Sequence, residues 1–127
     1  MAVDVDGQQL LSTSSKSAIL SDAFWARLNG VLNLLKPISE WITRIESDKP
    51  QLSLIARLFV ELATHCENTL PDTTLTKQEH KAILSGVAAR KELCVRAVHK
   101  AANLLYPLYV GKHLSEEDIV DAYDTIR

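Results

Sequence analysis

The stretch FWARLNGVLNLLKPISEWITRI, residues 24–45, decides the fold class of this chain. Its large apolar residues recur at steps of three and four, the period of a helix with one buried face; they are Phe24, Leu28, Val31, Leu32, Leu35, Ile38, Trp41, Ile42 and Ile45. Pro37 lies in the middle, where its ring clashes with the preceding turn and its missing N–H leaves a carbonyl unpaired. Because the apolar pattern continues unchanged, the stretch predicts one long helix kinked at Pro37 or two nearly coaxial helices.

Helical periodicity continues through the rest of the chain. Pro50 is suited to the first position of a second helix that runs to about residue 69. Thr76 and Glu79 form the capping-box pattern at the start of a helix of about thirty residues, which ends before Pro107. Gly86 weakens this helix, and a break near Arg90 is the alternative. Ser115 caps a last short helix. We therefore predict an all-α compact bundle of four to five helices over residues 21–127, preceded by a loosely ordered leader, 1–20.

Composition points to one domain with an ordinary core. The chain has 127 residues, 46% of them hydrophobic, and no apolar run is long enough to span a bilayer. Trp25 and Trp41 are expected to anchor the core. Cys66 and Cys94 fall inside predicted helices, which favours free buried thiols in an intracellular reducing compartment, with an interhelical disulfide as the alternative.

Charge is unevenly distributed. Residues 76–113 hold seven Lys/Arg against Glu79 and Glu92, whereas residues 114–127 hold Arg127 against five acidic residues. The candidate contacts to nucleic acid on this basic segment are Lys77, Lys81, Arg90, Lys91, Arg96 and Lys100. They are expected near the outer faces of one helix, where pairs four residues apart straddle a phosphate backbone. The alternative is a solvated basic face, or one covered by the acidic C-terminal segment.

Residue spacing argues against a catalytic, metal or cofactor site. His65 and Cys66 are adjacent, so a helix points them about 100° apart. Cys94 and His99 are five residues apart, a poor fit to one helical face. The four glycines are scattered, which leaves no phosphate-binding loop. We therefore predict no catalytic residue, no metal, no cofactor, no small-molecule substrate and no membrane contact.

Five segments taken in order resemble the hAT superfamily of DNA transposases: FWARL (24–28), LLKPI (34–38), ESDKP (46–50), VHKAANLLYPLY (98–109) and LSEED (114–118). The resemblance covers residues 23–127, with Tyr106 before Pro107 where the family more often has Asn or Asp. It implies the helical region that is inserted in the RNase H-like catalytic domain. The catalytic acids of that domain lie outside the matching stretch, and Cys66 and Cys94 lack the family's Cys-x-x-His spacing.

The resemblance implies a non-catalytic helical module, either excised from a hAT-type transposase or descended from one and reused. Its expected function is protein interaction or self-association as an assembly domain. The alternative is an accessory domain that contacts DNA through the basic segment 77–100. Nuclear residence is implied by the resemblance and not by a Lys/Arg-rich run.

Overall fold

The computed structural model describes residues 11–127, and these are all-helical, without a strand. The predicted all-α class is therefore confirmed. The described residues form six α-helices rather than four to five: α1 Thr13–Ile19, α2 Asp22–Ile45, α3 Leu52–Thr69, α4 Lys77–Cys94, α5 Ala97–Leu105 and α6 Glu116–Ile126, with a 3₁₀ turn, η1, at Leu70–Asp72. None of these helices combines the length and the apolarity needed to cross a membrane.

The first additional helix, α1, lies in the segment expected to be a leader. The Ser12 hydroxyl accepts a hydrogen bond from the Ser15 N–H at 3.1 Å and caps the helix. Its C-terminal end is joined to α2 by the Trp25 indole N–H, which donates to the Ile19 carbonyl at 2.8 Å. The part of the leader prediction that concerns residues 1–10 lies outside the described residues.

The second additional helix arises because the helix predicted over residues 77–105 is interrupted at Val95. Val95 has φ −83° and ψ 97°, an extended conformation that ends α4. The next helix then has its own cap, because His99 Nδ1 accepts from the Arg96 N–H at 3.0 Å. Pro50 likewise lies before the helix that it was predicted to start, since Gln51 is the N-cap of α3.

Helix α2 passes through Pro37 without ending, so the alternative of two coaxial helices is wrong; the kink stays a prediction. Pro37 deprives the Asn33 carbonyl, four residues earlier, of its helical donor. The Nε2 atom of His65, on α3, lies 3.2 Å from that carbonyl oxygen. The unpaired acceptor that proline creates is therefore satisfied by a neighbouring helix.

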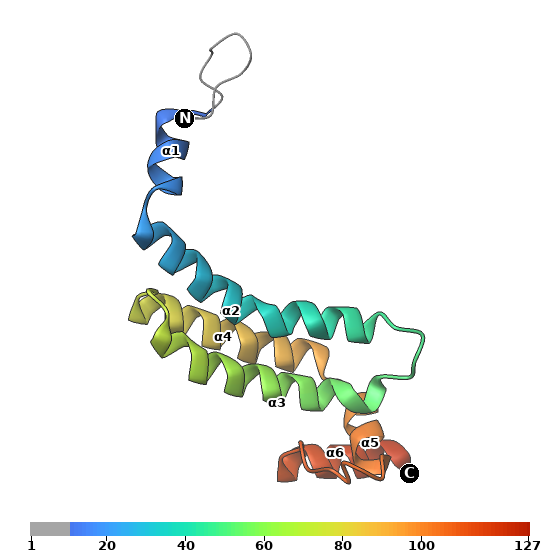
Figure 1. Cartoon of the computed structure of the whole chain (residues 1–127). Helices are drawn as coiled ribbons and strands as arrows, with labels where there is room; N and C mark the ends of the chain where they lie inside the picture. Colours follow the sequence, from blue (N-terminus) through green and yellow to red (C-terminus); the bar gives the residue numbers. More distant parts are fainter. Residues whose placement is uncertain (1–10) are drawn as a thin grey trace.

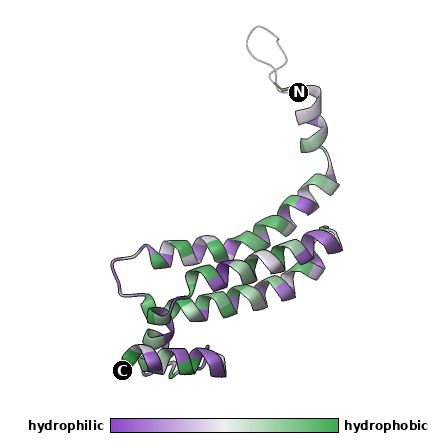
Figure 2. Cartoon of the chain, turned by 180° about the vertical axis from the view of Figure 1, so that it is seen from behind, coloured by the Kyte–Doolittle hydropathy of each residue, from purple (hydrophilic) through white to green (hydrophobic). Residues whose placement is uncertain are grey.

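Helices α2, α3 and α4 lie side by side, while α5 and α6 pack at one end of α3 (Figure 1). Apolar and polar segments alternate along these helices, as expected for amphipathic packing (Figure 2). Leu34, Cys66 and Leu70 form the buried centre of the three-helix part. Helix α1 stands away from the bundle, beyond the N-terminal end of α2 (Figure 1).

Candidate protein-interaction surface

Helix α2 has a wide apolar face of which its neighbours cover only part. Six large side chains on α2 stay 40% to 53% exposed; we call them the α2 strip: Phe24, Trp25, Leu32, Leu35, Ile42 and Ile45. Leu34, by contrast, is buried against α3 and α4. The apolar arc of α2 is therefore wider than α3 and α4 can bury, which leaves a lengthwise apolar surface on the bundle.

Three hollows follow this helix. One of about 130 Å³ lies between α2 and α3 and is lined entirely by apolar or aromatic residues: Ile38, Trp41, Ile42, Ile45, Leu58, Phe59 and Leu62. A second, of about 210 Å³, lies near the start of α2 and is lined by Phe24, Arg27, Leu28 and Val31. Apolar hollows of this kind accept side chains of a partner.

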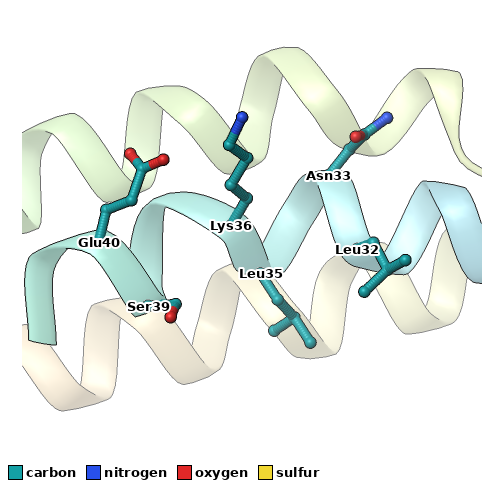
Figure 3. Close-up of a pocket in the computed structure, with 6 residues that line it drawn as sticks. All are labelled: Leu32, Asn33, Leu35, Lys36, Ser39 and Glu40. Atoms are coloured by element: carbon teal, nitrogen blue, oxygen red, sulfur yellow. The ribbon is translucent and has the colours of Figure 1, made fainter. Parts of the chain in front are cut away.

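The largest hollow, about 380 Å³, is formed by α2 residues without help from another helix. Leu32 and Leu35 point to one side of the helix, whereas Asn33, Lys36 and Glu40 point to the other (Figure 3). The ionisable groups therefore line the polar edge of the apolar surface rather than converge on one point. This arrangement suits docking of another molecule more than chemistry on a small substrate.

The candidate nucleic-acid contacts do not form a single surface. Lys77 and Lys81 are exposed and lie one turn apart on α4. Arg90, nine residues after Lys81, lies about 180° round the helix from it, and Lys91 is half-buried. The interruption at Val95 places Arg96 and Lys100 at and beyond the start of α5. The expectation that all six lie on one helix is wrong.

Lys100 is engaged within the molecule. Its ammonium lies 2.7 Å from a carboxylate oxygen of Asp118 and 2.7 Å from one of Asp121, and its side chain is 16% exposed. The hydrogen bonds that Lys100 donates to both carboxylates raise its pKa above the ordinary value. Burial opposes ionisation of Asp118, yet its hydrogen bonds with Lys100 and Ser115 hold its pKa below the usual value. Lys100 therefore ties α5 to α6 and is not free for a phosphate.

A polar cluster that the sequence did not reveal joins α3 to the α5–α6 connection. The Arg57 Nε donates to Glu61 at 2.6 Å, and Nη1 donates to the Tyr109 hydroxyl at 3.3 Å. The Tyr109 ring lies edge-on to His113, with centroids 5.0 Å apart. Fully buried Asn103 donates through Nδ2 to the Ser53 carbonyl at 2.9 Å and lies 3.4 Å from His113 Nδ1.

Electrostatics in this cluster favour fixed protonation states. Hydrogen bonds to Glu61 and Tyr109 raise the pKa of Arg57. Burial and then the nearby Arg57 charge lower the pKa of His113, which keeps its Nδ1 available as an acceptor. Because Arg57 bonds to Tyr109 and Asn103 bonds to the Ser53 carbonyl, the cluster clamps α3 to α5 and to the α5–α6 connection.

The two cysteines are free thiols in different surroundings. Cys66 is buried, and burial raises the pKa of its thiol. Cys94 is exposed because α4 ends there, so the expectation of a buried thiol is wrong for this residue. Within residues 11–127, no three His, Cys, Asp or Glu side chains gather as metal ligands would.

The tryptophans also differ from their expected role as core anchors. Trp25 is 45% exposed and belongs to the α2 strip. Trp41 is half-buried and lines the hollow between α2 and α3. Helical periodicity located Trp41 on the apolar face of α2, but it gave no sign of how much of that face the other helices cover.

Comparison with known proteins gives no match. No family model fits the chain, and neither a curated protein nor a solved structure is significantly similar to it.

Proposed function

We propose that this chain is a non-catalytic helical module that acts as a protein-interaction or assembly domain through the α2 strip. The observation that carries the proposal is the set of half-exposed apolar side chains that extends from one end of α2 to the other. Three hollows follow the same helix. The one between α2 and α3 is lined only by apolar or aromatic residues. Water excluded from such a surface drives association.

The motif resemblance supports the same class of function. The five segments from residue 24 to 118 resemble, in their order, the helical region of hAT-type transposases, a region that in that family contributes to assembly around a catalytic core. We extend the proposal to an origin in such a protein and to residence in the nucleus. No catalytic activity is proposed.

Photo-crosslinking tests the interaction proposal. The full chain carries p-benzoylphenylalanine in place of Leu32, in the α2 strip, or in place of Ser85, an exposed position on α4. In cells of the source organism we expect discrete protein adducts from position 32 and not from position 85. Equal or absent adducts at the two positions would contradict the proposal.

DNA contact is a second candidate, favoured by one observation. Lys77 and Lys81 are exposed on one flank of α4, while Glu79, which lies between them in sequence, is paired with Arg27 at 3.3 Å. Titration of duplex DNA at low salt then gives weak, sequence-tolerant binding that falls steeply with salt. The double variant Lys77→Glu/Lys81→Glu abolishes the binding, whereas Lys49→Glu, in the α2–α3 turn, does not. No mobility shift at low salt ends this candidate.

A further inference from the structure

Helix α2 carries a coiled-coil seam. Seven large apolar residues are separated by alternating steps of four and three: Phe24, Leu28, Val31, Leu35, Ile38, Ile42 and Ile45. This is the spacing of the a and d positions of a heptad, the positions at which two helices interlock. The heptad spacing continues past Pro37, which itself lies outside the seam.

Only the C-terminal part of the seam, Ile38, Ile42 and Ile45, borders the hollow between α2 and α3. Leu34 makes the buried contact with α3 and α4, and it lies outside the heptad set. Phe24, Leu35 and Ile42, by contrast, are 43%, 49% and 51% exposed. Helix α1 extends beyond the N-terminal end of α2 (Figure 1), and these three side chains stay exposed. The seam therefore has room for one more helix.

The sequence of α2 suits the same helix from a second copy. Around Leu35 the apolar residues are arranged symmetrically, with Leu28 and Ile42 seven residues to either side, and Leu32 and Ile38 three to either side. Two antiparallel α2 helices related by a two-fold axis at Leu35 therefore place Leu28 opposite Ile42 and Leu32 opposite Ile38, on either side of the axis. An antiparallel pair also sets the two helix dipoles in opposition.

The area is sufficient for a specific dimer. Six large side chains at 40% to 53% exposure offer on the order of 500 Å² per copy. Two copies bury roughly 1,000 Å², and the partly exposed seam residues Leu28, Val31 and Ile38 add to this. That total reaches the lower limit for a biological interface, about 1,000 Å².

From this spacing, exposure and area, we infer that the chain forms a two-fold homodimer in which the α2 strips of two copies pack antiparallel, with Leu35 near the axis. This inference rests on the proposed function and names its partner.

Sedimentation equilibrium of the full chain measures the stoichiometry. The expected result is a concentration-dependent species of twice 14.1 kDa at 100 µM chain. Leu35→Glu places two carboxylates at the axis and is expected to weaken dimerisation at least 100-fold. The matched control is Leu93→Glu, at a 59% exposed position on α4, which leaves the dimer intact. Far-UV circular dichroism verifies that both variants keep their helix content.

A monomer at 100 µM overturns the inference, as does equal weakening by the two variants. The photo-crosslinking experiment separates this failure from failure of the proposed function. If the wild-type chain is monomeric but position 32 crosslinks to another protein, the surface binds a different partner and the homodimer is wrong. If position 32 crosslinks to nothing, both proposals fail.

Thiol crosslinking tests the orientation. In a Cys94→Ser background, where the remaining Cys66 is buried, chains with Leu28→Cys and with Ile42→Cys are mixed and treated with a short bis-maleimide. The antiparallel arrangement predicts crosslinks between the two kinds of chain and few between identical ones. A majority of crosslinks between identical chains means parallel packing and overturns the antiparallel arrangement.

Discussion

At the scale of single residues, the contact between Pro37 and His65 shows how a local cost is offset at a distance. Proline removes one donor from α2, and the imidazole of His65 lies 3.2 Å from the carbonyl that loses it. The Asn33 carbonyl can only accept, so this contact is a hydrogen bond when His65 Nε2 carries the proton. A histidine from one helix thus allows a proline in another.

A double-mutant cycle tests this pairing. We expect His65→Ala to lower the free energy of unfolding by about 1 kcal/mol, because the Asn33 carbonyl loses its partner. In a Pro37→Ala background the backbone N–H is restored, and the same substitution is expected to cost much less. Urea unfolding followed by circular dichroism gives both values. Equal costs in the two backgrounds would show that the hydrogen bond is unrelated to the proline.

Val110 is the second informative residue. It has φ +47°, a left-handed conformation that a β-branched side chain adopts only under strain, and it is exposed. We expect Val110→Gly to raise the free energy of unfolding by about 1 kcal/mol, measured as an increase in Tm.

The neighbouring Gly111 is the opposite case. It has φ +76°, and an added Cβ would lie 3.2 Å from Leu104 Cδ1. Gly111→Ala is therefore expected to lower Tm. If Val110→Gly lowers Tm as well, the strain at Val110 is not what limits stability there.

At the scale of elements, ion pairs join α5 to α6. Lys100 binds two carboxylates of α6, and Asp118 also completes the N-terminal capping box of that helix. We expect Lys100→Met to lower the free energy of unfolding by about 1–2 kcal/mol, because partly buried Asp118 loses its cation. Chemical denaturation measures the loss. Lys112→Met, at an exposed lysine, is the control and is expected to be neutral.

His99 and His113 also predict that the stability of the fold depends on pH. Burial lowers the pKa of His99, and burial together with Arg57 lowers that of His113. A histidine with a lowered folded-state pKa stabilises the fold fully above its unfolded pKa, about 6.5, and loses that contribution as pH falls. We expect the urea midpoint to decrease from pH 7.5 to pH 5.5, and the double variant His99→Gln/His113→Gln to reduce this decrease. A midpoint independent of pH would contradict the argument.

Some of these elements could be located from the sequence, and others could not. Period and caps located α2, the Thr76 cap and the Ser115 cap, because these depend on residues within a few positions of each other. The sequence indicates a break in this helix near Arg90 as an alternative, but its position at Val95 could not be predicted, since no Pro or Gly marks it and the cap of the next helix, His99, is not a usual one. The pairing of Lys100 with α6 depends on how two helices pack, which residue spacing does not encode.

At the scale of the whole molecule, the helices of the bundle do not bury all of their own apolar surface, and α2 in particular stays partly exposed. The sequence predicted the apolar face of α2, yet the number of helices that would cover it depends on the packing. We expect Tm to rise with protein concentration, by about 4 °C or more over a 100-fold range, because dimerisation stabilises the folded state. Calorimetry of wild type and Leu35→Glu measures this, with the variant independent of concentration. A wild-type Tm that is constant over this range would contradict dimer-linked stability.

The two tryptophans make this molecule its own optical reporter. The Trp25 indole is bonded to α1 through the Ile19 carbonyl, and Trp41 lies in the hollow between α2 and α3. Detachment of α1 exposes the first indole to water and shifts its emission to the red, while Trp41 keeps its spectrum. In a chain with Trp41→Phe, the emission wavelength of Trp25 therefore reports whether α1 is docked, without any attached dye.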